Sequence, residues 1–349
     1  MFIREAWYVV ALSSEVENGT LLPRKILGDP LVIFRDGDGA PVALGDRCPH
    51  RFAPLHRGRL RDGVLACGYH GLEFDRTGSC VHNPHGAGEI PPGRGVRAYP
   101  MIERYGLIWI WTGEAEADPS LLPSLSFVEE TPPNAVNHGY MATAANYLLM
   151  TDNIMDLSHA DFVHPSTLGT SGAVTGSVPQ VRSQDGTVEI FWSWRNFPAM
   201  PVFAPLLPNN GERSDGWIKV KWSAPTHMVL SSGVSDAEAS PEDELQSTTL
   251  HTMTPADDGN THYFFVSTRS FLQDNVQVTE MAKAAQHQAF VEEDKPMLED
   301  AQKLMGTSEF WSLKPWILSA DGAAVRVRRT IEKYVREEEK GRARRTAEE

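Results

Sequence analysis

The stretches "RCPHRFAPLHRG" (47–58) and "LACGYHGLEF" (65–74) decide how the first part of this chain folds. They place Cys48 and His50 in a C-x-H pattern and, after sixteen further residues, Cys67 and His70 in a C-x-x-H pattern. Thiolates and imidazoles are the ligands that suit either a tetrahedral zinc ion or an iron–sulfur cluster. Each ligand pair follows an expected strand, so two hairpin tips can close over one metal centre.

The residues around these ligands favour a cluster over zinc. Pro49, Gly68 and Gly71 leave nearby backbone N–H groups free to approach a cluster sulfur, which a closed zinc site does not require. Zinc remains the alternative from spacing alone. Cys80 lies outside the pattern, and we expect it to be a packed thiol.

The composition limits the classes of function. The chain has 349 residues with 41% hydrophobic and 22% charged residues, which is enough for one large domain or two ordinary ones. No apolar run is long enough for a membrane span, and the start lacks the features of a signal peptide, so we expect a cytoplasmic protein without a membrane partner. The net charge of −14 argues against nucleic acid as a partner.

The pattern of short strands predicts an all-β domain over residues 1–115. The apolar runs at 31–34 and 41–44 flank "RDGDGA", in which Asp-Gly predicts a hairpin turn. An aromatic and β-branched strand at 105–113 ends this domain. Residues 116–135 are rich in proline, serine and acidic residues, and we expect them to form a linker.

Residues 136–340 predict a mixed domain, followed by a charged tail at 341–349. The fold class expected for the whole chain is therefore α+β, with an antiparallel sheet flanked by helices (a helix-grip-like arrangement) after the all-β domain. Helices are expected at 146–160, 276–304 and 323–339, and strands at 188–194, 216–222, 227–234 and 262–269.

The stretch "DNIMDLSHADFVHP" (152–165) predicts a second metal site. On a continuous helix Asp152, Asp156 and His159 would share one face. Pro165 disfavours helical geometry for the residue before it, so the chain should break near 161–164 and bring His164 back toward His159. The alternatives are a helix-capping role for Asp152 and ordinary polar packing for His159.

A third ligand is expected in "QHQAFVEEDKPMLEDAQ" (286–302). On a regular helix Asp294 lies in the middle of an apolar face, and such a carboxylate must be paired or metal-bound. Two histidines and one carboxylate form the facial triad of non-haem Fe(II) oxygenases. His287 falls on the same side and is either a site residue or a core histidine. The other four carboxylates are expected to face solvent: Glu292, Glu293, Glu299 and Asp300.

The motif D-N-x-x-D-x-x-H-x-x-x-x-H, after C-P-H-R…C-G-Y-H-G, resembles the oxygenase component of Rieske non-haem iron oxygenases. The resemblance runs from "WYV" at 7–9 to the last expected helix. Within the family, the vanillate and dicamba O-demethylase group is the most similar, judged by "HRFAPL", "YHGLEFD", "CVHNPHG" and "HYFF".

The resemblance implies two cofactors, a [2Fe-2S] cluster and a mononuclear Fe(II) ion. Cys48 and Cys67 would bind one cluster iron, and His50 and His70 the other. The mononuclear iron would be held by His159, His164 and Asp294.

The resemblance also implies how electrons travel. In a head-to-tail homotrimer Asp156 would connect His159 to His70 of the neighbouring chain, and Asn153 would sit by the iron without being a firm ligand. Electrons would come from NAD(P)H through a reductase, with or without a ferredoxin.

The implied activity is that of a monooxygenase that uses O2 to O-demethylate a small methoxylated aromatic acid, giving a phenol and formaldehyde. His251, in "HTMTP", resembles a pocket position that binds a polar group of the substrate. Arg195, Lys219 and Lys221 could serve a carboxylate, but surface positions are the simpler interpretation. The alternatives are hydroxylation of a methyl group, an N-methyl group or a ring, and, outside the enzymes, a Rieske electron carrier or a zinc-stabilised binding protein.

Overall fold

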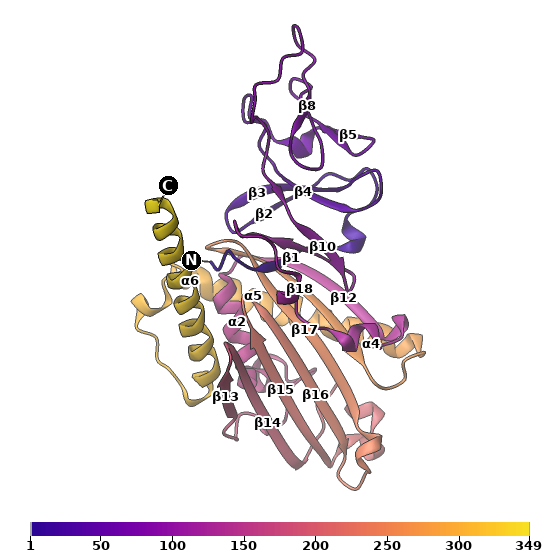
Figure 1. Ribbon diagram of the computed structural model, residues 1–349. Helices are drawn as coiled ribbons and strands as arrows, with labels where there is room; N and C mark the ends of the chain where they lie inside the picture. The colour runs from indigo at the N-terminus through magenta and orange to yellow at the C-terminus, as the bar shows by residue number, and fades with distance from the viewer. Residues whose placement is uncertain (1, 349) are drawn as a thin grey trace. The chain divides into compact units, whose positions relative to one another are not determined.

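The computed structural model describes residues 2–348 (Figure 1). The chain forms two compact units. Phe2–Leu122 together with Thr254–Asp258 make up the N-terminal unit, and Pro123–Met253 with the residues from Gly259 onward make up the C-terminal unit. The short segment joins the N-terminal unit because the carbonyls of Pro255 and Ala256 accept hydrogen bonds from the backbone of Leu27 and Gly28.

The N-terminal unit consists of three small antiparallel sheets, in the orders β1-β11-β10, β2-β3-β4-β9 and β5-β6-β7-β8. The expected hairpin is confirmed as β3 and β4, where Phe34 pairs with Val42. Every residue of β11 is buried, as its aromatic and β-branched sequence suggests. The strands are β1 (Trp7–Leu12), β2 (Leu22–Ile26), β3 (Asp29–Arg35), β4 (Pro41–Gly45), β5 (Arg59–Arg61), β6 (Val64–Ala66), β7 (Glu73–Phe74), β8 (Cys80–His82), β9 (Ala98–Tyr99), β10 (Met101–Arg104) and β11 (Leu107–Trp111).

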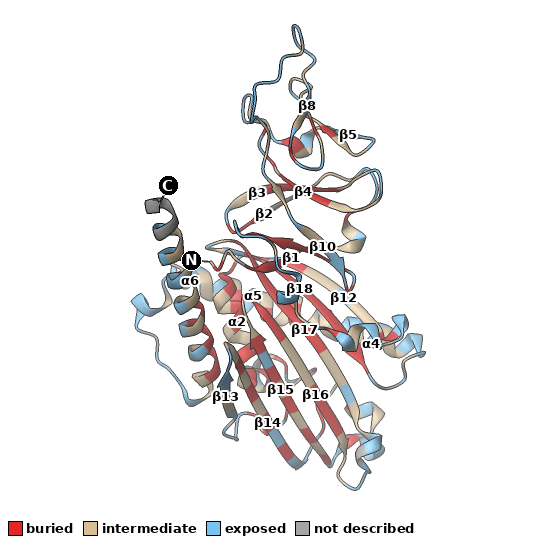
Figure 2. Cartoon of the chain, in the orientation of Figure 1, coloured by how far each residue is buried: buried red, intermediate tan, exposed pale blue. Residues whose placement is uncertain are grey.

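A single seven-stranded sheet forms the centre of the C-terminal unit, in the order β12-β18-β17-β16-β15-β14-β13. It contains the four expected strands and three that the sequence pattern did not indicate, β12, β13 and β17. Buried residues run along its central strands (Figure 2). The strands are β12 (Val136–Thr143), β13 (Gln180–Gln184), β14 (Thr187–Phe197), β15 (Ser214–Ser223), β16 (His227–Asp236), β17 (Leu245–Asp257) and β18 (Asn260–Arg269). Together the two units confirm the α+β fold class.

The expected helix at 146–160 is not continuous, which corrects the sequence prediction. It begins as α2 (Tyr147–Met155), capped by the Asn146 side chain, and it ends at Asp156, whose φ of −131° and ψ of 99° are extended. A 3-10 turn (Leu157–His159) and the short α3 (Ala160–Val163) follow. The four-residue α1 (Ser126–Glu129) precedes them.

The second expected helix is present but contains an irregular segment. It runs as α4 (Val276–His287), a π-helical segment (Gln288–Asp294) and α5 (Lys295–Met305). Pro296 has no N–H group, so it cannot donate to the carbonyl four residues earlier, and the N–H of Lys295 bonds five residues back to Phe290. The periodicity of the apolar residues does not indicate this wider turn.

The last helix, α6 (Gly322–Glu348), is longer than expected, since the charged tail continues it and residue 349 lies outside the described residues. It packs on α2 and β14. Among residues 2–348, no helix is long and apolar enough to cross a membrane.

Candidate metal centres and cavity

The cluster ligands of the N-terminal unit lie on two loops with the same backbone hydrogen bonds. In each loop the cysteine N–H donates to the carbonyl five residues later, and the cysteine carbonyl accepts from the N–H four residues later. The pairs are Cys48 N to Ala53 O (2.9 Å), Phe52 N to Cys48 O (2.9 Å), Cys67 N to Leu72 O (2.8 Å) and Gly71 N to Cys67 O (2.9 Å). The chain thus presents two matched loops that hold their first ligand in the same way.

The four side chains divide into a buried sulfur pair and a more exposed nitrogen pair, and the two ligand types are those of a [2Fe-2S] centre with mixed ligands. Cys48 and Cys67 are only 2% and 4% exposed and belong to a core with Leu65 and Phe74. His50 is exposed and His70 is half-buried, and the centroids of their rings lie 4.5 Å apart. The donor set therefore fits a cluster with an inner iron on sulfur and an outer iron on nitrogen. Cys80, half-buried, packs against the same core.

The environment of His70 favours the neutral form of its ring. Desolvation, followed by electrostatic interactions with His50, Arg51 and His85, lowers the pKa of His70. His85 also approaches the His70 carbonyl with Nε2 at 2.8 Å. A neutral imidazole is the form that binds a metal.

In the C-terminal unit, His159, His164 and Asp294 come together from α2–α3 and the π segment. One ligand atom from each lies within 4.8 Å of the others. Oδ1 of Asp294 is 3.1 Å from Nε2 of His164 and 3.5 Å from Nε2 of His159. His164 is 1% exposed and Asp294 6% exposed, so an unpaired carboxylate there would be unfavourable. These donors fit one Fe(II) ion with coordination positions left open.

The break at Asp156 orients His159. The Asp156 carboxylate accepts from the Ser158 N–H at 2.9 Å, and its backbone carbonyl accepts from Nδ1 of His159 at 2.6 Å. Because a carbonyl can only accept, the His159 proton is on Nδ1 and Nε2 is free for a metal. The expectation that Asp156 and His159 share one face of a continuous helix is therefore wrong, and their contact uses the backbone. His164 ends α3 immediately before Pro165, as predicted.

Asn153 and Glu293 surround the three ligands. Nδ2 of Asn153 is 3.1 Å from Oδ1 of Asp294 and 3.3 Å from Nε2 of His159. Oε2 of Glu293 is 2.6 Å from Nδ1 of His164, so the expectation that Glu293 faces solvent is wrong. A regular helix would turn Glu293 away, and the wider π turn brings it to the same histidine as Asp294. Pro296, two residues beyond Asp294, is the one signal in the sequence that could have suggested this.

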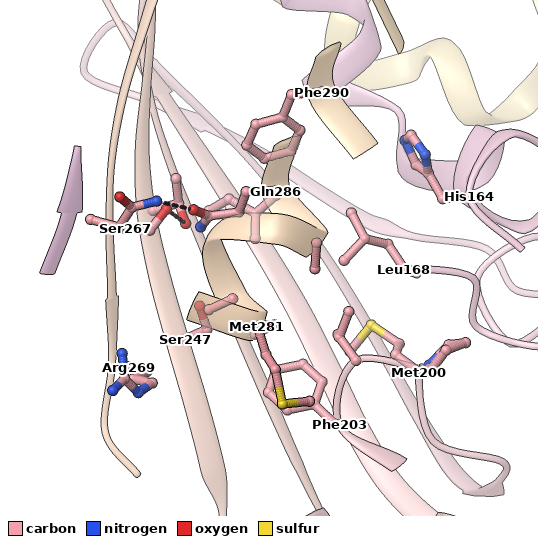
Figure 3. Close-up of a pocket in the computed structure, with 18 of the residues that line it drawn as sticks. His164, Leu168, Met200, Phe203, Ser247, Ser267, Arg269, Met281, Gln286 and Phe290 are labelled. Atoms are coloured by element: carbon pink, nitrogen blue, oxygen red, sulfur yellow. Dashed lines mark hydrogen bonds between the residues drawn. The ribbon is translucent and has the colours of Figure 1, made fainter. Parts of the chain in front are cut away.

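A cavity of about 280 Å³ opens beside the three ligands, between α4 and the sheet (Figure 3). Most of its lining is apolar, and its members include Leu168, Met200, Phe203, Met281 and Phe290.

His251 lies in the lining of the cavity, and its role in binding a polar group of the substrate stays a prediction. It is 2% exposed, and its Nδ1 bonds to the Tyr263 hydroxyl. Burial lowers the pKa of His251 to about 3, so the ring is neutral.

The other candidates for substrate binding lie outside the cavity lining of the described residues. The His287 side chain is 63% exposed and lies 3.5 Å from Glu292, which corrects its placement near the metal. Arg195 is 90% exposed beside Asp215. Lys219 and Lys221 alternate with the buried residues of β15 and face away from the core.

Comparisons with known proteins agree with both centres. Residues 6–100 match the Rieske [2Fe-2S] domain, and residues 143–337 match the vanillate O-demethylase oxygenase C-terminal domain. The chain is 39% identical to the oxygenase component of dicamba O-demethylase of Stenotrophomonas maltophilia, over 95% of this chain and 97% of that protein. It is 36% identical to the oxygenase component of chloroacetanilide N-alkylformylase of Rhizorhabdus wittichii, over 97% of each chain.

Among solved structures, dicamba monooxygenase bound to 3,6-dichlorosalicylic acid matches with a TM-score of 0.89 and 38% identity, over 97% of this chain and 98% of that one. The Rieske ligand pattern, the facial triad and these matches over nearly the whole length lead to one conclusion. The chain belongs to the Rieske non-haem iron oxygenases, as an oxygenase component with a C-terminal domain of the vanillate O-demethylase type.

Proposed function

We propose that this protein is the terminal oxygenase of an O-demethylase, which converts a methoxylated aromatic compound, such as a vanillate-like acid, into a phenol and formaldehyde. The observation that carries the proposal is the triad of His159, His164 and Asp294 at one end of a mostly apolar cavity of about 280 Å³. A cavity of this size and character suits a substituted benzene ring. The names of the dicamba and vanillate relatives support the same reaction type.

The residues of this chain hold and orient the reacting groups. His159, His164 and Asp294 would hold the mononuclear iron on one side, which leaves the cavity side open to O2 and substrate. When bound, the two iron centres supply electron storage and oxygen activation. The apolar walls exclude water and position the methyl group. Insertion of one oxygen atom into its C–H bond gives a hemiacetal, which collapses to the phenol and formaldehyde, while the other atom leaves as water with two electrons and two protons from the donor.

The electrons require partners. A reductase, acting directly or through a ferredoxin, would reduce the cluster held by Cys48, His50, Cys67 and His70. We propose a head-to-tail homotrimer in which the half-buried Asp156 lies between His159 of one chain and His70 of the next. The hydrogen bond of His159 to Asp156 supports this, because it ties the ring orientation directly to that residue.

The experiment is a formaldehyde assay. Protein purified anaerobically with about three irons per chain is mixed with a suitable reductase, NAD(P)H and a panel of methoxybenzoates and uncharged aryl methyl ethers. Formaldehyde equimolar with the phenol is expected from at least one of them. If the panel gives none while toluene derivatives are hydroxylated, the demethylase assignment is wrong.

Removal of an N-alkyl group is the second candidate, because the 36% identical relative is named as an N-alkylformylase. N-alkyl anilides belong in the same panel, where an aldehyde and the free anilide would mark this reaction.

A further inference from the structure

Two amide side chains meet across the cavity. Asn137 on β12 and Gln286 on α4 both line it, and Nδ2 of Asn137 donates to Oε1 of Gln286 (Figure 3). Among residues 2–348 the remaining atoms, Oδ1 of Asn137 and Nε2 of Gln286, have no hydrogen-bond partner. The pair therefore presents one acceptor and one donor side by side, and it would still do so if both amides were turned over.

The described cavity lining contains one arginine and no lysine, and hydrogen bonds hold that arginine in place. The charged side chains of the described lining are Asp294, which belongs to the metal site, and Arg269. The Arg269 guanidinium donates through Nη2 to the Leu272 carbonyl and, at 2.8 Å, to the Thr279 hydroxyl, so it anchors the loop that begins α4. The Arg269 guanidinium is thus held by these neutral acceptors, and a carboxylate beside Gln286 would lose its hydration and gain a counter-charge only if Arg269 left them.

The separation between the amide pair and Asp294 matches the length of a substituted benzene ring. Gln286 precedes Asp294 by eight residues, and because most of them form the π segment, which rises less per residue than an α-helix, the two lie about 10 Å apart along the axis. Phe290 lies between them and lines the same wall. That separation spans a benzene ring whose methoxy group is at the metal and whose opposite substituent is at the amide pair.

We propose that the cavity selects an uncharged aromatic carboxamide, with Asn137 and Gln286 as the residues that determine specificity, over the corresponding carboxylate. The inference rests on the proposed function and narrows its substrate class from an acid to an amide. The substrate N–H donates to Oδ1 of Asn137, and its carbonyl accepts from Nε2 of Gln286. A carboxylate cannot donate, so it leaves the acceptor unsatisfied as well as burying a charge.

Binding tests the proposal separately from catalysis. The iron-loaded full chain is titrated anaerobically by calorimetry with 4-methoxybenzamide, 4-methoxybenzoate and methoxybenzene. The benzamide is expected to bind about 100-fold more tightly than the benzoate. Equal or tighter binding of the benzoate would overturn the proposal.

Substitutions identify the residues. Gln286→Leu should weaken benzamide binding about tenfold and leave methoxybenzene binding unchanged. Gln277→Leu is the matched control, since it makes the same change at an exposed position of the same helix, outside the described lining, and should alter neither. Gln286→Lys should reverse the preference in favour of the benzoate, because it supplies the missing cation. Iron content and melting temperature confirm that each variant is folded.

Arg269 offers the competing explanation, because its Nε is buried without a hydrogen-bond partner in the described structure. If the benzoate binds tightly and Arg269→Gln removes that binding alone, Arg269 is the recognition residue and the amide proposal is wrong. If the benzamide binds but neither compound yields formaldehyde, the O-demethylase function fails while the amide specificity stands. Formaldehyde from the benzoate alone would overturn the amide specificity and keep the O-demethylase.

Discussion

His164 lies between two consecutive carboxylates, with Nδ1 at 2.6 Å from Glu293 and Nε2 at 3.1 Å from Asp294. Neighbouring residues of a regular helix point about 100° apart, so they would not ordinarily reach opposite edges of one ring. The π segment makes this possible. Glu293 thereby fixes which edge of the imidazole faces the metal, as carboxylates behind metal-bound histidines generally do.

Glu293→Gln is expected to weaken binding of the mononuclear iron by about 10- to 100-fold, because a neutral acceptor orients His164 less firmly. Competition with an iron chelator measures the affinity, and the visible spectrum of the cluster should not change. Glu292→Gln is the matched control, since the Glu292 side chain is 62% exposed. Equal iron affinity in Glu293→Gln and Glu292→Gln would contradict this role.

Asp156→Asn is expected to keep both metal centres but to lose most turnover. The asparagine side chain can still accept the hydrogen bond from the Ser158 N–H, and the backbone carbonyl that orients His159 is unchanged. The fold should therefore be retained. The lost carboxylate charge would instead interrupt the proposed connection between neighbouring chains. Single-turnover reduction of the mononuclear iron measures this step, and a normal rate would remove Asp156 from the electron path.

Mixed assemblies extend this test to the arrangement of subunits. Trimers of Asp156→Asn chains with His70→Ala chains should regain activity, because an intact cluster of one chain can then face an intact Asp156 and iron of the other. Trimers of Asp156→Asn with His159→Ala chains should regain little. Absence of recovery in the first mixture, with mixed trimers verified by mass, would place the electron path within one chain.

Arg328→Met is expected to destabilise the C-terminal unit by about 3 kcal/mol, because it leaves the Asp152 carboxylate without its partner. Arg328 is 5% exposed and donates to both oxygens of Asp152, which ties α6 to α2, the helix that precedes the two histidine ligands. Urea unfolding measures the change. Lys303→Met, which breaks the exposed pair with Asp300, should show no measurable loss and serves as the control.

The ion pair of Arg35 and Glu103 predicts a pH-dependent contribution to stability. The hydrogen bond from Arg35 lowers the pKa of Glu103 below its ordinary value of 4.5. The unfolded chain therefore takes up this proton at a higher pH than the folded chain, so the stabilisation is complete above pH 4.5 and is lost as the pH falls below it. Glu103→Gln should lower the free energy of unfolding by about 1 kcal/mol at neutral pH, a modest value because solvent screens this ion pair. The difference should become progressively smaller in acid. A constant difference between the two proteins across this range would refute the assignment.

The sequence predicted both metal centres because their ligands are identified by residue type and local spacing. Cys48, His50, Cys67 and His70 lie within 23 residues, and Pro165 marks the turn that returns His164 toward His159. Asp294 was found from its apolar neighbours. The ligand sets therefore needed little knowledge of the tertiary structure.

The features that the sequence did not predict depend on backbone geometry and tertiary contacts, which a periodic pattern does not contain. The helix stops at Asp156 because its side chain caps the next turn, and a periodic pattern does not show that choice. The prediction that Glu293 faces solvent is wrong because a helical wheel assumes regular turns and cannot represent a π segment. Asn137 and Gln286 are 149 positions apart in the chain, so their meeting follows only from the packing of α4 on the sheet.

The π segment also sets the rotation, about the helix axis, of the metal ligand Asp294 relative to the cavity-lining residues of α4. Residues before it, such as Gln286, line the cavity, and Asp294 at its end faces the two histidines. A π turn holds about one residue more than an α turn, so regular turns over the same residues would rotate one half against the other by about 100°. Every ligand would still be present in the sequence, yet the carboxylate would no longer face the metal while the cavity wall was in place. The placement of Asp294 therefore depends on the turn geometry of residues 288–294 as much as on the identity of the ligands.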